Sequence, residues 1–350
     1  MHLEELANET IIDVFLSLPT VSAAVNLSST CHRFRHIFAS SKRLLILREA
    51  ADNEYGPLDD IVQLVTHNSS QPAHVHRDVP ISKALIGSVV KAGRIAVKWE
   101  QMYVYKKWKA DFQNRRCLTV DERYVLRRAL YRLWLFARAF HNPDQHRTLR
   151  ASAPAVYDRA ALLHNFSTVE LAEMLDMHMI LRDTISRNIC PSNSAIRSKV
   201  YKRFPESTGQ LLFNPHFNLL PHSWSSLDSD CYHSSANAAI HFRNKYTSSR
   251  YHEPGAEGWG DDIMHYYVVE DMLKLDPEQI MWLKENAPYK SQVEGYTRTM
   301  GEWFENNGET FVQTMQLVLQ QRGGDLEEMK IAIEDGEFGI ALATRRDSVV

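Results

Sequence analysis

The apolar residues of this chain recur every three to four positions, and this spacing constrains the fold more than any other feature. Such a repeat places side chains on one face of an α-helix, whereas a β-strand needs an alternation of two. No convincing set of alternating segments is found in the sequence. The clearest helical face is formed by Leu126, Leu130, Leu133, Ala137 and Phe140. The sequence therefore predicts a mainly α-helical fold.

Signals for helix starts support this prediction. Thr119 with Glu122, and Ser167 with Glu170, each fit a capping box, in which side chain and backbone satisfy each other's free groups. Asp-Pro-Glu-Gln at 276–279 provides a cap, a first-turn proline and an acid that favours the helix dipole. We expect three short helices within 8–37, a helix starting at 277, and further helices near 41–53, 57–67 (with Pro57 in its first turn), 82–109, 120–141, 167–188, 260–275, 289–306 and 309–322.

The composition is that of an ordinary globular chain, with 44% hydrophobic residues and a net charge of −3 over 350 residues. The N-terminus lacks the pattern of a signal peptide, and no uninterrupted apolar run reaches roughly eighteen residues, so we expect no membrane span. The four cysteines are far apart, which favours free thiols in a reducing compartment, the cytoplasm or the nucleus.

The first forty residues carry more apolar surface than a segment of this size can bury alone. The first helix expected there contains Ile11, Ile12, Val14, Phe15, Leu16 and Leu18. One inward face needs roughly half as many apolar residues. We expect the surplus to be covered by the rest of the chain or by a partner, and an exposed apolar groove of short helices is typical of a docking surface.

The order of residues in this segment also resembles a known motif. Leu6-Ala7-Asn8-Glu9-Thr10-Ile11-Ile12-Asp13-Val14-Phe15 is followed by Leu18-Pro19 and by Asn26-Leu27-Ser28-Ser29-Thr30-Cys31-His32-Arg33-Phe34-Arg35. This resembles the F-box, which runs Leu-Pro-x-Glu, an apolar cluster ending in Phe, a Leu-Pro turn, and a Leu-Ser-x-Val-Cys-x-x-Phe/Trp-Arg helix. Ala7 stands where the family prefers Pro, and Thr30 where an aliphatic residue is common.

The resemblance implies a three-helix F-box followed by an irregular all-α domain. F-box proteins bind a Skp-type adaptor that joins them to a cullin–RING ubiquitin ligase, and their downstream region selects the protein to be ubiquitinated. The chain is then a substrate receptor that performs no bond chemistry and needs no cofactor. The adaptor contacts implied by position in the motif are Leu6, Ala7, Ile11, Val14, Phe15, Pro19, Leu27, Cys31 and Phe34. The alternative is that most of these residues are internal packing.

Other interpretations of Cys31 and its neighbours are less economical. On a helix, Cys31 and Phe34 share one face and the nearby arginines are solvated. A metal site needs further ligands at suitable spacing, and only His36 lies one turn from His32. The arginines are too few for us to expect a nucleic-acid contact.

Residues 83–128 interleave basic and aromatic side chains, a combination that can bind single-stranded nucleic acid. We favour an amphipathic helix whose aromatic residues face the core and whose lysine stems cover the rim, because no RNP, KH or zinc-knuckle signature accompanies it. The functional alternative that we prefer to nucleic acid is a substrate-binding surface. Its candidate residues are Trp99, Tyr103, Lys106, Trp108 and, further along the chain, Trp224.

Charge is unevenly distributed. Residues 91–150 contain 15 Lys and Arg against 5 Asp and Glu, whereas residues 253–337 contain 6 against 19. We interpret these regions as facing each other in one fold or as solvated helix faces, although either could attract a charged partner.

Two further groups of residues have suitable chemistry for a site, but we favour a structural role for both. Asp261 and His265 share a helix face as an acid–base pair would, yet acids in a first turn also complement the helix dipole. The irregular segment 205–235 holds His216, His222, Cys231 and His233. Their spacing matches no common zinc pattern, so we predict no metal, and no motif of a known enzyme class supports catalysis.

The predicted organisation is an F-box at 1–40, a helical extension and linker at 41–80, a helical substrate-recognition domain at 81–340 and a flexible tail at 341–350. The expected partners are the adaptor, the cullin–RING ligase through it, and a protein substrate, with no membrane. Two alternatives remain: a scaffold that binds the adaptor without the cullin, and a helical nucleic-acid-binding protein.

Overall fold

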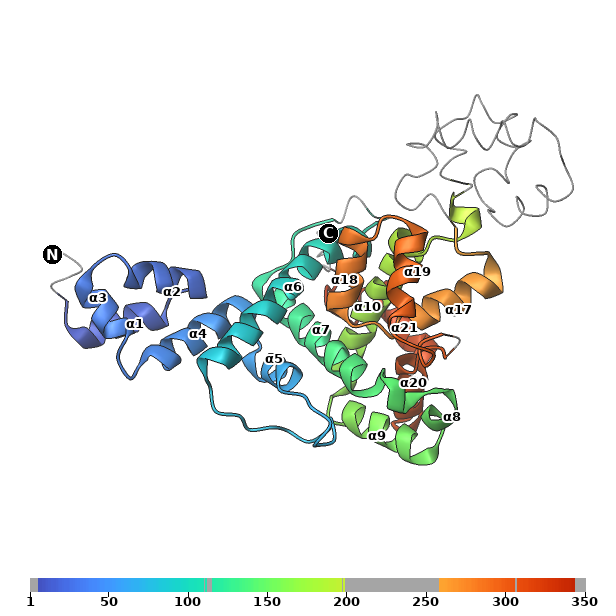
Figure 1. Ribbon diagram of the computed structural model, residues 1–350, viewed down its shortest axis with the longest axis horizontal. Helices are drawn as coiled ribbons and strands as arrows, with labels where there is room; N and C mark the ends of the chain where they lie inside the picture. Colours follow the sequence, from blue (N-terminus) through green and yellow to red (C-terminus); the bar gives the residue numbers. More distant parts are fainter. Residues whose placement is uncertain are drawn as a thin grey trace, which may run out of the picture. The chain divides into compact units, whose positions relative to one another are not determined.

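The computed structural model of the chain describes residues 6–109, 111, 115–196, 198, 258–305 and 307–343 (Figure 1). Within these residues every regular element is a helix and no strand occurs, so the prediction of a mainly α-helical fold is confirmed for this part of the chain. None of the helices described is long and apolar enough to cross a membrane.

The chain divides into two compact units. Residues 1–141, 152–178 and 311–350 belong to the first unit, and residues 142–151 and 179–310 belong to the second. The first unit contains α1 (Asn8–Leu16), α2 (Val21–Ser28), α3 (His32–Phe38), α4 (Arg43–Tyr55), α5 (Leu58–Val65), α6 (Lys83–Lys107), α7 (Val120–Phe140), α9 (Ala153–His164), most of α10 (Thr168–Thr184), α20 (Phe311–Gln321) and α21 (Leu326–Glu334). The second contains the end of α10, the 3-10 helix η2 (Pro143–Gln145), α8 (Arg147–Arg150), the π-helix η3 (Ile185–Ile189), α17 (Asp262–Met272), α18 (Pro277–Asn286) and α19 (Lys290–Arg298).

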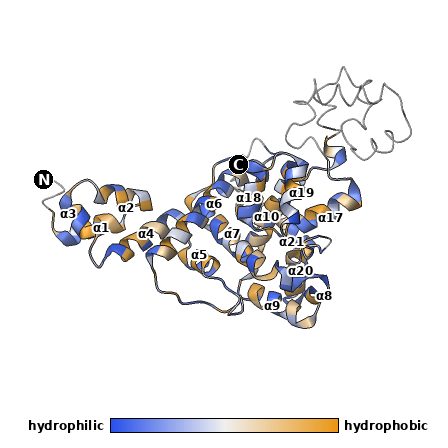
Figure 2. Cartoon of the chain, viewed as in Figure 1, coloured by the Kyte–Doolittle hydropathy of each residue, from blue (hydrophilic) through white to orange (hydrophobic). Residues whose placement is uncertain are grey.

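The core of the first unit lies where α6 and α7 pack against each other and against α4 and α5 (Figures 1 and 2). Trp99 of α6 and Tyr131 of α7 are fully buried there, and the Tyr131 hydroxyl donates to the Tyr55 carbonyl oxygen at 2.8 Å. Gly93 allows α4 to approach α6, because a Cβ at this position would lie 2.3 Å from the Tyr55 ring. Large aromatic residues at helical spacing thus fill the space between four helices.

Arg128 and Arg132 of α7 neutralise buried and half-buried acids of the same unit. Arg132 Nε lies 2.6 Å from Asp60 Oδ1, and its Nη1 lies 2.7 Å from Glu170 Oε1. Arg128 bonds to both oxygens of Glu173. Burial alone would raise the pKa of Glu170, but the Ser167 backbone N–H and Arg132 lower it to about 2. Part of the basic region is therefore neutralised by acids that lie outside the acidic C-terminal region.

The second unit is held around a buried lysine. Lys274 Nζ donates to Asp271 Oδ1 at 2.8 Å and to the Phe304 carbonyl oxygen, and it lies 4.5 Å from the centre of the Phe304 ring. The same Asp271 oxygen accepts from the backbone N–H groups of Asn307 and Gly308. A buried ammonium needs such partners because desolvation penalises its charge, and burial indeed lowers the pKa of Lys274.

Most of the expected helices are present at their expected places. The capping boxes at Thr119, Ser167 and Asp276 are all formed. The helix expected at 289–306 is wrong beyond Arg298, where α19 ends. Thr299 contributes to this end, because its hydroxyl donates to the Tyr296 carbonyl oxygen at 2.6 Å, a local bond that competes with further helix.

Smaller differences concern Pro57 and several helices that were not expected. Pro57 is the N-cap residue of α5 rather than a first-turn residue, and its peptide bond to Gly56 is cis. The sequence predicted no helix at η2, α8, α9 or α21. The segment 205–235, with Trp224 and the His and Cys residues named above, lies outside the described residues, as does most of the tail at 341–350. The domain boundaries at 40, 80 and 340 stay a prediction.

Candidate functional site

Helices α1, α2 and α3 pack around an aromatic centre within the first unit (Figure 1). Phe15 is fully buried, with its ring 6.3 Å from that of Phe34 and 5.7 Å from that of Phe38. Ile11 is also buried. These residues therefore hold α1 and α3 together from inside.

Local hydrogen bonds fix where each of these helices begins. Thr20 Oγ1 accepts from the Ala23 backbone N–H at 3.0 Å, which caps α2 after the Leu-Pro turn. Cys31 Sγ accepts from the Phe34 backbone N–H at 3.4 Å and caps α3. Cys31 is thus a capping residue rather than a member of the helix, which the motif alone did not indicate.

The start of α1 is held from another helix. Ala7 is the N-cap residue and makes no side-chain cap bond. Arg33 of α3 does not replace this cap but anchors the same segment, because its Nη2 donates to the Leu6 carbonyl oxygen at 2.6 Å and to Asn8 Oδ1 at 2.8 Å. Arg33 was expected to be solvated; it is half-buried and joins α3 to the segment that precedes α1.

Helix α4 covers one side of the three helices. The Val21 backbone N–H donates to Glu54 Oε2 at 2.8 Å, and Asn53 Nδ2 donates to the Leu18 carbonyl oxygen at 3.1 Å. Helix α4 also packs against α1, α2 and α3. The rest of the chain therefore covers part of the apolar surplus that the sequence places here.

The nine implied adaptor contacts fall into two groups. Ile11, Phe15 and Phe34 are buried, so their side chains are part of the internal core. The accessible residues, half-buried or exposed, are Leu6, Ala7, Val14, Pro19, Leu27 and Cys31. Val25 of α2, which is 47% exposed, is a further accessible apolar residue that the motif did not imply as a contact. Its position one turn after Val21 was the available signal.

The implied substrate contacts are mostly unsuited to direct contact. Trp99 and Tyr103 are fully buried, as the favoured amphipathic-helix interpretation predicts, and they are corrected here to core residues. Lys106 and Trp108 are half-buried at the end of α6, and Trp224 lies outside the described residues. Among the described residues, the structure therefore brings no two of the implied substrate contacts together at the surface, and only Lys106 and Trp108 are accessible.

A buried carboxylate anchors the segment after α21 to the first unit. Asp176 of α10, only 1% exposed, accepts from the Tyr103 hydroxyl at 2.6 Å, from Lys107 Nζ at 3.0 Å and from the Ile340 backbone N–H at 3.0 Å. A Cβ on Gly339, whose φ is +102°, would lie 2.7 Å from Asp176 Oδ2. Sequence reasoning missed Asp176, although a lone acid inside the apolar run MLDMHMIL was a usable signal.

A hollow of about 540 Å³ lies beside this anchor, between the end of α6 and the segment after α21. Lys107 and Arg116 line it, but both are already paired, Lys107 with Asp176 and Arg116 with Glu122 through two oxygens. Trp108 forms part of the wall and lies under the Arg116 guanidinium. The two basic groups of this hollow are therefore satisfied within the protein.

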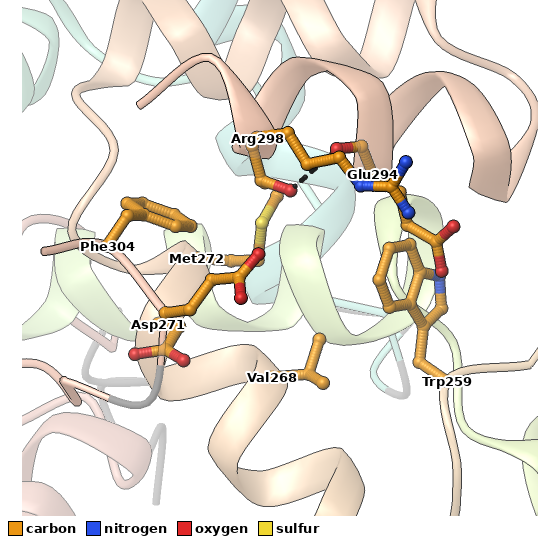
Figure 3. A pocket seen from close by; sticks show the side chains of 9 residues that line it. Trp259, Val268, Asp271, Met272, Glu294, Arg298 and Phe304 are labelled. Carbon is orange, nitrogen blue, oxygen red and sulfur yellow. Dashed lines mark hydrogen bonds between the residues drawn. The ribbon is translucent and has the colours of Figure 1, made fainter. Parts of the chain in front are cut away.

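The second unit has a smaller hollow of about 280 Å³ (Figure 3). Figure 3 shows Trp259 on one side and Phe304 on the other, with Glu294 and Arg298 of α19 above them. Lys290 Nζ already lies 5.0 Å from the centre of the Trp259 ring. The hollow therefore combines aromatic walls with side chains of both charges and selects no single ligand class.

Asp261 and His265, considered above as an alternative acid–base pair, bond to other groups. The Asp261 carboxylate accepts from the Ser194 backbone N–H at 2.7 Å, and His265 Nε2 lies 2.8 Å from the Cys190 carbonyl oxygen. Burial raises the pKa of the Cys190 thiol, which keeps it protonated. The described residues contain no group of His, Cys, Asp and Glu that could hold a metal ion.

Comparison with known proteins gives no assignment. No family model, no curated protein and no solved structure matches the chain. The functional argument therefore rests on the residues themselves.

Proposed function

We propose that residues 6–38 form an F-box-type docking surface for a Skp-type adaptor, and that the chain presents a protein substrate to a cullin–RING ubiquitin ligase. One observation carries the proposal. The segment whose residue order resembles the F-box consists of three short helices, and apolar side chains remain accessible on them. Accessible apolar side chains on a packed helical support suit a protein partner.

The two groups of motif residues take different roles in this proposal. The accessible group, Leu6, Ala7, Val14, Pro19, Leu27 and Cys31, makes the contacts. Ile11, Phe15 and Phe34 support that group from inside, so a change at Phe15 would disturb the three helices themselves. A test of docking must therefore use the accessible residues.

The proposed mechanism is proximity rather than bond chemistry. Holding a substrate beside a ubiquitin-loaded enzyme raises the effective concentration of its target lysine. The chain then needs no cofactor, and its activity depends on binding two partners at once. Arg127, Arg128 and Arg132 of α7 are paired with carboxylates, which argues against their use in binding nucleic acid.

The test is co-expression of the full chain with a Skp-type adaptor, followed by size-exclusion chromatography. We expect the complex to co-elute, and Val14→Asp or Leu27→Asp to abolish co-elution because each places a charge in an apolar contact. Val169→Asp is the matched control, because Val169 is 51% exposed on α10, outside the three helices. Circular dichroism and melting curves must show that the variants stay folded.

Two results would change the proposal. If Val14→Asp and Leu27→Asp still co-elute with the adaptor, this surface does not make the contact. If the wild-type chain does not co-elute, the adaptor is not a partner of this chain. Recovery of a cullin with the complex separates the ligase proposal from a scaffold that uses the adaptor alone.

A further inference from the structure

Arg77 lies in the segment between α5 and α6 and is only 6% exposed. Its backbone is tied to the Gln63 side chain, because Arg77 N donates to Gln63 Oε1 at 2.9 Å and Gln63 Nε2 donates to the Arg77 carbonyl oxygen at 2.7 Å. These two bonds fix the position of Arg77 without using its guanidinium group.

The guanidinium group has only neutral partners. Its Nη2 donates to the Gln63 carbonyl oxygen and to His67 Nδ1, each at 3.2 Å. Its Nε and Nη1 are buried and have no hydrogen-bond partner among the described residues. An arginine stays protonated at neutral pH, so a full positive charge and several N–H donors are covered without a counter-ion.

The charged groups near Arg77 do not compensate its positive charge. Burial lowers the pKa of Arg77, and no carboxylate acts to raise it. A second arginine, Arg138, acts on the same His67 ring, and burial together with both arginines lowers the pKa of His67. Buried charges are normally paired, and an unpaired one is costly to keep. An anion bound here would remove that cost.

We propose that Arg77 and His67 form a binding site for a small oxyanion such as a phosphate group. The Nε and Nη1 groups supply charge-assisted donors to the anion's oxygens, while the neighbouring positive charge of Arg138 favours a dianion. The phosphate group could be free or carried by a phosphorylated side chain. The site lies outside residues 6–38, and the inference is independent of the adaptor proposal.

Because the guanidinium is buried, an anion reaches it only if the segment between α5 and α6, which contains Arg77, moves. Residues 68–71 are exposed and lie outside any helix. Two of its hydrogen bonds are local, Ser70 N to Asn68 Oδ1 at 2.9 Å and Val75 N to the Pro72 carbonyl oxygen at 3.2 Å, and one bond, from Asn165 Nδ2 to the His74 carbonyl oxygen at 2.7 Å, ties it to a distant part of the chain. A non-helical segment of this kind opens at lower cost than a helix.

The test is a titration of the full chain with inorganic phosphate, with ionic strength held constant by sodium chloride. We expect a saturable rise in melting temperature and a binding isotherm by calorimetry. Arg77→Gln should raise the dissociation constant for phosphate by roughly tenfold or more, because it removes a charged donor. Arg48→Gln, at an exposed position of α4, is the matched control and should bind phosphate as the wild-type chain does.

Two outcomes would overturn the proposal: no stabilisation by phosphate beyond that of chloride, or equal binding by the wild-type chain and Arg77→Gln. A folded Arg77→Gln variant is expected, since its backbone ties to Gln63 remain. A phosphoserine peptide and its unphosphorylated form distinguish the two sources of phosphate. Competition by the phosphopeptide supports a carried group, and binding of inorganic phosphate alone supports a free anion.

Discussion

At the scale of single residues, Asp176 concentrates several interactions that no local sequence pattern could supply. Its two oxygens join α6, α10 and the segment after α21 through Tyr103, Lys107 and Ile340. The lone acid in an apolar run indicates a buried polar role, but its partners lie 69 to 164 positions away in the sequence. The sequence could therefore indicate that Asp176 is buried, whereas its hydrogen-bond partners depend on the tertiary fold.

We predict that Asp176→Ala lowers the free energy of unfolding of the first unit by about 3–5 kcal/mol, because Lys107 and the Tyr103 hydroxyl lose their partner in a buried place. Tyr103→Phe should cost only about 0.5–1.5 kcal/mol, since Asp176 keeps Lys107 and Ile340 N. Urea denaturation of both variants checks this order. Equal losses would show that Asp176 does not organise the network.

His67 gives a prediction about pH. Burial, Arg77 and Arg138 lower its pKa in the folded chain below the ordinary value of 6.5. The folded state then binds a proton less readily than the unfolded state, so stability is fully present above about pH 6.5 and is lost as pH falls toward the lowered pKa. Urea denaturation between pH 5 and 8 should show a smaller loss for His67→Gln than for the wild-type chain. Identical pH profiles would contradict this.

At the scale of elements, helix starts were predictable because their signals are local. The capping boxes at 119–122 and 276–279 need only residues three apart, and both are formed. Helix ends were less predictable, as the early end of α19 shows. The support of α1 by Arg33 could not be predicted either, because the two are separated by a complete helix and two turns.

The cap of α7 gives a prediction at this scale. Thr119 Oγ1 accepts from the Glu122 backbone N–H at 3.2 Å, and the Glu122 carboxylate accepts from Thr119 N at 2.8 Å. Thr119→Ala should therefore destabilise the first unit by about 1 kcal/mol. Ser152→Ala is the control, because Ser152 precedes α9 without a side-chain cap bond, and its change should fall within about 0.5 kcal/mol. Thermal denaturation measures both, and similar losses would contradict the assignment.

At the scale of the whole molecule, helical periodicity gave the fold class but not the division of the chain. The first unit draws on three separate stretches of sequence, and no composition shift marks where the chain leaves it, near residues 141 and 178, or returns to it, near residues 152 and 311. The interpretation of 83–128 as an amphipathic helix also predicted that its aromatic residues face the core. Trp99 and Tyr103 are indeed buried on α6. The candidate docking surface was predictable in position, and its separation into core and accessible residues required the packing of α4.

Hydrogen–deuterium exchange of the full chain, with and without a Skp-type adaptor, tests the proposed function most directly. The adaptor should slow exchange at backbone amides of residues 6–38, where α1, α2 and α3 carry the accessible apolar side chains, and leave the second unit unchanged. Exchange at residues 6–38 that is unaffected by saturating adaptor, or protection confined to other parts of the chain, would contradict the proposed docking surface.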